Sequence, residues 1–131
     1  MKNRGLLNAE IIREVASAGH TQMIAIGDAG LPIPPGVRRI DLSVVPGLPA
    51  FADVLQAVCG EMVVEAYTYA EEACQANPGV VQAMERLMPG IPGRTLSHED
   101  FKILLQRANV VIRTGEYSSY ANVILTAGVN F

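Results

Sequence analysis

The sequence contains no tryptophan, and aromatic residues make up only 5% of its 131 residues. Basic residues are also sparse, since no cluster of lysine and arginine is longer than Arg38-Arg39 and the net charge is -3. A protein that follows a phosphate backbone needs clustered cations, so this composition disfavours nucleic acid as a partner. The glycine spacing of a dinucleotide-binding fingerprint and the Walker-type Gly-Lys-Ser/Thr are absent as well, so nucleotide binding has no support.

Long apolar runs are lacking too. No apolar segment approaches the length needed to span a bilayer, and no signal-peptide core follows Met1. The chain has only two cysteines, Cys59 and Cys74, which are explained better as reduced thiols than as a disulfide. We therefore expect a cytoplasmic protein with no membrane partner.

What the sequence has in abundance is aliphatic side chains. Half of the residues are hydrophobic and 18% are charged, so a sizeable core is available within a single domain over residues 1–131. Because this apolar fraction is high for a small monomer, we expect part of it to cover interfaces between copies of the chain.

Helical and extended patterns alternate along the chain. Asn8 can cap a helix that ends before Gly19, and Met23–Ile26 is a short apolar run typical of a buried strand. Further helices are expected after Pro49, Pro78 and Ser97, strands over residues 39–44, 62–69, 109–113 and 122–126, and loops over 31–36 and 89–94, while residues 71–75 could extend or begin a helix. This alternation predicts an α/β fold, a layered sandwich with a mainly parallel or mixed sheet flanked by helices.

Two histidines, His20 and His98, and one aspartate are the first candidates for a site. His20 precedes the apolar strand and Asp28 follows it, beside a Gly/Pro-rich loop of the kind that carries sites in α/β proteins. Each histidine could instead be a surface residue or a cap, and Asp28 could simply hydrogen-bond its own loop backbone. Two histidines without a third ligand make a weak case for zinc, so no metal is expected.

The other candidates lie in the second half of the chain. Tyr120 and Asn122 would point the same way on an extended backbone, and a phenol beside a carboxamide suits a polyhydroxylated ligand. They could equally be a tyrosine covering a sheet edge and an asparagine in a turn. Lys102, one helical turn after the second histidine, reads most simply as a solvated lysine. Glu65, inside an apolar segment, is either an exposed charge or the partner of an arginine such as Arg113.

A series of short motifs follows along the chain with almost no insertions. In order these are Leu7-Asn8, Gly19-His20-Thr21, Asp28-Ala29-Gly30-Leu31-Pro32-Ile33-Pro34, Arg39-Ile40-Asp41, Glu65-Ala66, His98-Glu99, Phe101-Lys102, Arg113-Thr114-Gly115-Glu116, Tyr120 to Leu125, Gly128-Val129 and Phe131. Together they resemble the D-ribose pyranase family over the whole chain. The related L-fucose mutarotases typically have glycine between the tyrosine and the asparagine, where this chain has Ala121. Ser119 replaces a frequent proline of the family, a departure outside the motifs.

The resemblance implies an isomerase that interconverts the pyranose and furanose forms of D-ribose without a cofactor. It also implies that His20 is the proton donor, that Asp28, His98, Tyr120 and Asn122 bind the sugar, and that Lys102 is a further contact. The chemistry agrees with these residue types, because ring opening needs an acid and a base, and histidine can serve as either near neutral pH.

Strand geometry adds a constraint. If residues 21–27 are extended, His20 and Asp28 lie roughly 20–25 Å apart at about 3.3 Å per residue, farther than one ribose can reach. We therefore predict that the site is shared between two subunits. The resemblance implies ring-like homo-oligomers of eight or ten copies, in agreement with that prediction.

Three alternatives stay open. The chain could be a mutarotase for another sugar such as L-fucose, or a non-catalytic sugar-binding accessory module on the same fold. A metal hydrolase that uses both histidines is the third reading, and it predicts stoichiometric metal in the purified protein.

Overall fold

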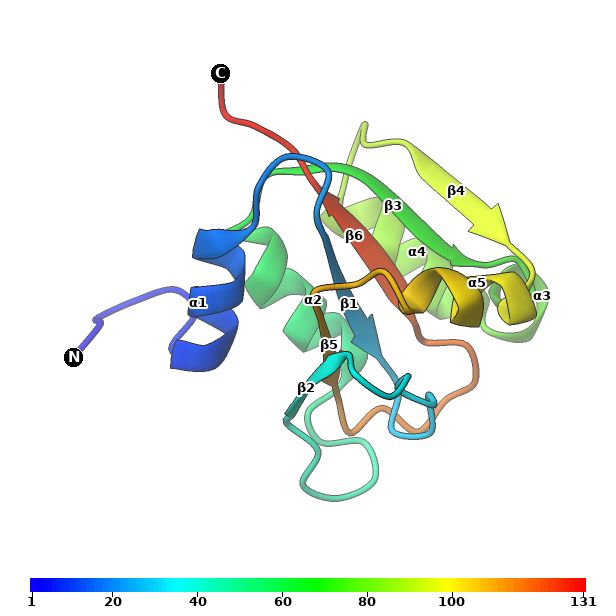
Figure 1. The fold of residues 1–131 in the computed structure, drawn as a ribbon. Helices are drawn as coiled ribbons and strands as arrows, with labels where there is room; N and C mark the ends of the chain where they lie inside the picture. The colour runs from blue at the N-terminus through cyan, green and yellow to red at the C-terminus, as the bar shows by residue number, and fades with distance from the viewer.

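A computed structural model describes residues 1–131, and its centre is a six-stranded mixed sheet (Figure 1). The strand order across the sheet is β2-β5-β1-β6-β3-β4. The strands are β1 (Met23–Gly27), β2 (Arg38–Asp41), β3 (Val64–Ala70), β4 (Gly93–Leu96), β5 (Val110–Arg113) and β6 (Val123–Ala127). This is the α/β class with a mixed sheet that the sequence predicts.

Strand direction decides which loops meet. β1, β2 and β5 run parallel to one another, β3 pairs in parallel with β4, and β6 lies antiparallel between β1 and β3. All strands except β6 therefore end at one edge of the sheet, which we call the carboxyl edge, and β6 begins there. The opposite edge, where β1 and β3 begin and β6 ends, we call the amino edge.

Five helices flank the sheet, and most begin where the capping residues predict. They are α1 (Ala9–Ser17), α2 (Phe51–Cys59), α3 (Ala73–Ala76), α4 (Pro78–Leu87) and α5 (His98–Leu105). The Asn8 side chain accepts a hydrogen bond from the Ile11 backbone at 3.0 Å, and Ser97 caps α5 through Asp100 at 3.1 Å. None of these helices is long and apolar enough to cross a membrane.

The sheet separates two hydrophobic clusters. α1, α2 and α4 pack on one face, and α5 covers the other (Figure 1). β1 shows the alternation clearly, because Ile24 and Ile26 join the larger cluster while Ala25 joins Phe101 of α5 in the smaller one. Both faces of β1 are thus buried, as its unbroken apolar run predicts.

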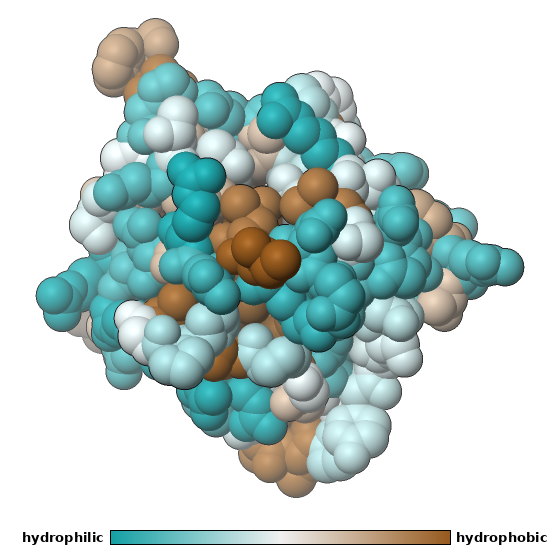
Figure 2. Space-filling view, turned by 45° about the vertical axis from the view of Figure 1, so that its right-hand side comes forward, coloured by the Kyte–Doolittle hydropathy of each residue, from teal (hydrophilic) through white to brown (hydrophobic).

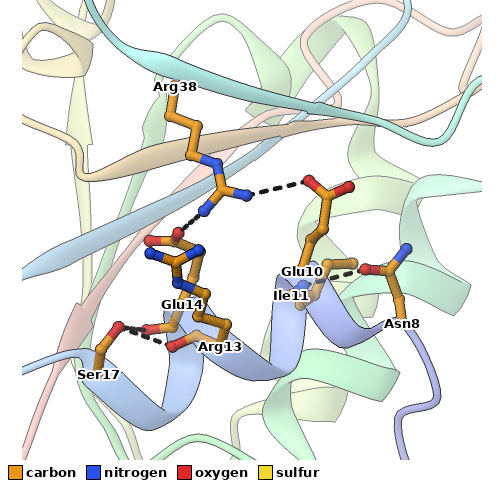
Figure 3. Close-up of polar contacts among 7 residues, drawn as sticks. All are labelled: Asn8, Glu10, Ile11, Arg13, Glu14, Ser17 and Arg38. Atoms are coloured by element: carbon orange, nitrogen blue, oxygen red, sulfur yellow. Dashed lines mark hydrogen bonds and ion pairs between the residues drawn. The ribbon is translucent and has the colours of Figure 1, made fainter.

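An arginine ties the edge strand β2 to the first helix. The guanidinium of Arg38 pairs with Glu10 at 3.1 Å and also with Glu14, both one turn apart on α1 (Figure 3). The pairs are partly exposed, so their contribution to stability is about 1 kcal/mol at most for each.

Two predicted boundaries are wrong. The second strand ends at Asp41 rather than Val44, because Ser43 turns back to hydrogen-bond the Asp41 carboxylate. Residues 89–94 are not entirely loop, since Gly93 and Arg94 begin β4. β4 is an exposed strand at the edge of the sheet, and its residues show no alternation of apolar and polar side chains. Its extended conformation depends on its pairing with β3, which the local sequence does not reveal.

Candidate active site

Asp28 and Asn122 meet at the carboxyl edge. Asp28 directly follows β1, Asn122 directly precedes β6, and the Asp28 backbone N–H donates to the Asn122 side-chain oxygen at 2.8 Å. The Asp28 Oδ1 accepts a hydrogen bond from the Gly30 backbone at 2.9 Å, so Asp28 does bond its own loop, as one of the two alternatives expected. This turn orients the carboxylate and leaves Oδ2 without a partner in the chain.

His98 and Tyr120 pack against each other at the same edge. Their ring centroids are 5.1 Å apart in an edge-to-face arrangement, and the His98 ring also stacks with Phe101 at a centroid distance of 6.2 Å. The backbone N–H of His98 donates to both oxygens of Glu72, at 2.9 and 3.1 Å. These contacts fix the imidazole where α5 begins.

The expected extended backbone between Tyr120 and Asn122 is wrong. Tyr120 has φ 57°, a left-handed conformation that non-glycine residues rarely adopt, and it lies in a turn before β6. The turn is anchored by Asn77, whose amide donates to the Ser118 hydroxyl at 2.9 Å and to the Ser119 carbonyl at 2.8 Å. Tertiary contacts, rather than strand geometry, therefore place the phenol.

Two buried polar atoms at this edge have no partner. They are the Asn122 Nδ2 and the His98 Nδ1, and they are the only such side-chain atoms in the chain. A buried polar atom without a hydrogen bond costs about 1–3 kcal/mol, so two of them make this edge the first candidate for a binding site. Sugar hydroxyls can both donate and accept, so they can bond to an amide donor and to an imidazole nitrogen alike.

An arginine network supports the loop after Asp28. The Arg113 guanidinium donates to the Ala29 carbonyl at 3.0 Å, to the Asp41 carboxylate at 3.0 Å and to the Ser43 hydroxyl at 2.7 Å. Hydrogen bonds from Ser43, together with Arg113, hold the pKa of Asp41 below its ordinary value. A surface pocket of about 380 Å³ opens here, lined by Asp28, Ala29, Gly30, Arg113, Tyr117, Ser118 and Ser119.

His20 lies apart from this group. It follows α1 at the amino edge, and its Nε2 is 2.8 Å from the Glu65 Oε2 at the start of β3. Of the two alternatives for Glu65, the pairing with Arg113 is therefore wrong, since the carboxylate is partly exposed and pairs with His20. Thr21 and Gln22 belong to a turn rather than to the strand, yet His20 and Asp28 still lie at opposite ends of β1, and no pocket includes both.

Lys102 is on α5 with His98, but its ammonium turns to Glu99 at 2.7 Å and lowers the pKa of that carboxyl. It lines a shallow hollow against residues 32–35 rather than the pocket beside Asp28. No three His, Cys, Asp or Glu side chains come together as metal ligands.

Two supporting residues were not anticipated from the sequence. Glu72 and Asn77 hold His98 and the Tyr120 turn, and both lie around the short helix α3. The pattern over residues 71–75 was ambiguous, so the only available signal was a pair of polar residues in a segment without clear periodicity.

The fold and this edge define the class of protein. An α/β sheet carries carboxylate, amide, imidazole and phenol groups at the edge where its parallel strands end, which is the usual location of a small-molecule site in such sheets. Residues 1–130 match the model of the RbsD / FucU transport protein family, and the chain belongs to that family. The resemblance that the motifs carry is confirmed.

Relatives of known name match along the full length. The chain is 55% identical over 131 residues to a D-ribose pyranase of Paracidovorax citrulli and 49% identical to one of Symbiobacterium thermophilum, with all of each protein covered. The structure of Bacillus subtilis RbsD complexed with D-ribose is 47% identical, with a TM-score of 0.96 and complete coverage of both chains. A fucose mutarotase of Streptococcus pneumoniae, in complex with L-fucose, is 20% identical with a TM-score of 0.85 over both full chains, and shares the fold.

Proposed function

We propose that this protein is a D-ribose pyranase, an isomerase that interconverts the pyranose and furanose forms of D-ribose. The observation that carries the proposal is the full-length match to Bacillus subtilis RbsD, whose structure contains D-ribose, at 47% identity. The polar groups at the carboxyl edge agree with it, because the buried His98 Nδ1 and Asn122 Nδ2 have no hydrogen-bond partner within the chain.

The chemistry is the opening and closing of a cyclic hemiacetal. A base takes the proton of the anomeric hydroxyl while an acid protonates the ring oxygen, and closure through another hydroxyl gives the other ring size. His20 is the proton donor in this proposal, and Asp28, His98, Tyr120 and Asn122 bind the sugar, with Lys102 as a further contact. General acid–base catalysis of this kind contributes about 10²–10⁴-fold, and it requires no cofactor.

Each proposed binding group offers a hydrogen bond that the chain leaves unused. The Asp28 Oδ2 can accept from a sugar hydroxyl, and the Asn122 Nδ2 can donate to one. The His98 Nδ1 and the Tyr120 hydroxyl lie on the two rings that pack together beside them. Ribose, with hydroxyls on successive carbons, can engage several of these groups at once.

The catalytic unit in this proposal is a homo-oligomer, a ring of eight or ten copies, in which each copy is one domain. His20 is at the amino edge and the sugar-binding group at the carboxyl edge, so two copies are needed to bring them together. Large apolar side chains on the surface are available to cover such contacts, and Figure 2 shows apolar patches between polar regions. The exposed aliphatic side chains include Leu7, Val44, Val45, Leu48 and Ile103.

A cytoplasmic location accompanies this function. Cys59 and Cys74 are both free thiols, as expected for a reducing compartment. Burial raises the pKa of Cys59 to about 11, which keeps that thiol protonated and unreactive at neutral pH.

Saturation-transfer NMR on D-ribose tests the proposal. The wild-type protein is expected to accelerate pyranose–furanose exchange, and His20→Ala is expected to remove the acceleration while ribose still binds. The same measurement with L-fucose addresses the mutarotase alternative, since faster exchange of fucose than of ribose would favour it. Binding of ribose without faster exchange would support a non-catalytic sugar-binding module and sink the enzyme proposal.

A further inference from the structure

The contact between the His20 and Glu65 side chains depends on an irregularity in the sheet. The two side chains come from segments 45 residues apart, and their Nε2 and Oε2 atoms are 2.8 Å from each other. Both side chains are partly exposed, with 53% of His20 and 40% of Glu65 accessible in the single chain. A contact between two exposed, flexible side chains needs a structural reason to be maintained.

On the side of Glu65, a β-bulge in β3 holds the carboxylate near His20. The register of β3 against β6 shifts between Val64 and Ala66, so Glu65 is the extra residue without a partner on β6. The shift changes the side-chain alternation, because Val64 and Tyr67 both belong to the larger hydrophobic cluster although residues three apart in a regular strand face opposite ways. A bulge bends the strand and redirects a side chain, and here the redirected side chain is a carboxylate.

A glycine on the neighbouring strand leaves room for this arrangement. Gly128 follows β6, and its backbone N–H donates to the Val63 carbonyl at 2.8 Å. A Cβ atom at position 128 would lie 3.1 Å from the Glu65 Cβ and 3.2 Å from a Val63 methyl group. A larger residue at this position would therefore press on Glu65 in the bulge and on Val63 just before β3.

The turn that carries His20 is hydrogen-bonded to the same end of β6. Thr21 has φ 68°, an unusual conformation for a β-branched residue, and its N–H donates to the Ala127 carbonyl at 2.8 Å. The Gly19 N–H donates to the Gln22 side chain at 2.8 Å and closes the turn around the histidine. The turn and the bulge thus converge on one imidazole–carboxylate pair.

We infer that Glu65 is a positioning residue for His20: its carboxylate accepts a hydrogen bond from Nε2–H and leaves Nδ1 as the ring nitrogen that faces the sugar. The inference rests on the proposed function of His20. Glu65 exchanges no proton with the sugar in this account. It fixes the orientation of the imidazole, so that the protonated ring donates to the sugar from Nδ1. The neutral ring that remains after this donation carries its hydrogen on Nε2, as carboxylates arrange for histidines at many sites.

Two measurements on Glu65→Ala, Glu65→Gln and the control Glu85→Gln test the inference. The first is ¹⁵N NMR of protein labelled only in histidine, which gives two sets of ring signals that His20→Ala assigns. Wild-type His20 is expected as the Nε2–H tautomer at a pH where it is neutral, and Glu65→Ala is expected to give a mixture. Glu65→Gln, which keeps the side-chain volume and an acceptor oxygen, should retain more of the Nε2–H form than alanine does.

The second measurement is the ribose exchange rate at saturation together with the dissociation constant for ribose. Glu65→Ala is expected to lower the saturated rate by roughly tenfold, which is less than the loss of about 10²–10⁴-fold expected when His20 itself is removed. The dissociation constant should stay within about twofold, because Glu65 contacts His20 and not the sugar in this account. Glu65→Gln should recover part of the rate, and Glu85→Gln, an exposed residue of α4, should leave both quantities unchanged.

The outcomes separate the inference from the proposed function. An unchanged tautomer in Glu65→Ala, or an unchanged rate in both Glu65 variants, would overturn the role of Glu65 even if His20→Ala is inactive. A fully active His20→Ala variant would overturn the proposed role of His20, whatever the tautomer measurement gives. Because the tautomer is measured without ribose, it does not depend on the enzyme assay.

Discussion

Two polar residues are completely buried in this chain, Thr114 and Asn122, and both support the carboxyl edge. The Thr114 hydroxyl donates to the Gly27 carbonyl at 2.8 Å and accepts from the Glu116 N–H at 3.1 Å. Asn122 uses its oxygen for the Asp28 backbone and leaves its nitrogen free. Both polar groups of Thr114 are therefore hydrogen-bonded within the protein, whereas Asn122 keeps an unused donor for the sugar that we propose it binds.

Thr114→Val is expected to lower the free energy of unfolding by about 1–3 kcal/mol. The change keeps the shape of the side chain, but it removes two hydrogen bonds and leaves the partly buried Glu116 N–H without its acceptor. Urea unfolding measures the difference. Thr126→Val on β6 is a suitable control, since no side-chain hydrogen bond involves Thr126, and equal losses in the two variants would contradict this account of Thr114.

At the level of helices and strands, local pattern identified most of the fold. The helix caps at Asn8 and Ser97 and the buried strand β1 could be predicted from the sequence, because each depends on neighbouring residues alone. β4 and the bulge at Glu65 were not, because both depend on pairing between strands. β4 also needs Gly93, whose missing side chain leaves space for the Tyr67 ring, a requirement visible only when the strands are adjacent.

A second close approach joins the segment after β5 to the loop before α2. The Gly115 N–H donates to the Pro49 carbonyl at 2.9 Å, and the Gly115 carbonyl accepts from Gly47 at 2.7 Å. A Cβ atom on Gly115 would lie only 2.0 Å from the Leu48 carbonyl oxygen, so the two backbones cannot keep their positions around any other residue.

Gly115→Ala is therefore expected to destabilise the protein by about 1–3 kcal/mol or more, as overpacked sites do. Gly79→Ala provides the opposite control, because Gly79 lies in α4 with nothing within 4 Å of the added methyl group. Alanine there should stabilise the protein by about 0.4–1 kcal/mol. Thermal or urea unfolding of both variants measures the two shifts, and a Gly115→Ala protein as stable as Gly79→Ala would refute the close approach.

For the whole molecule, strand direction assigns the candidate residues to two edges. The sequence named all six, from element boundaries and from the family resemblance, but it could not show which of them are neighbours. Asp28 and Asn122 meet because β6 runs antiparallel to β1. His98 lies at the same end of the sheet because it follows β4, the strand that the sequence did not predict. His20 is left at the far edge for the same topological reason.

That separation makes the shared site the central claim, namely that His20 of one copy acts on a sugar held by the carboxyl edge of another. Mixed oligomers of His20→Ala and Asp28→Ala chains in a 1:1 ratio test it. If the two residues come from different copies, about one quarter of the sites in a randomly mixed closed ring contain both native side chains. A matched mixture of Asp28→Ala with Asn122→Ala should show no recovery, because both changes affect the same edge.

The ribose exchange rate of the mixed His20→Ala and Asp28→Ala oligomer is the most direct measurement. The account predicts about one quarter of the wild-type rate per chain, from two variants that are each inactive alone. A rate no higher than that of the separate variants, in oligomers proven to contain both chains, would contradict it, because His20 and Asp28 would then serve the same site from one chain.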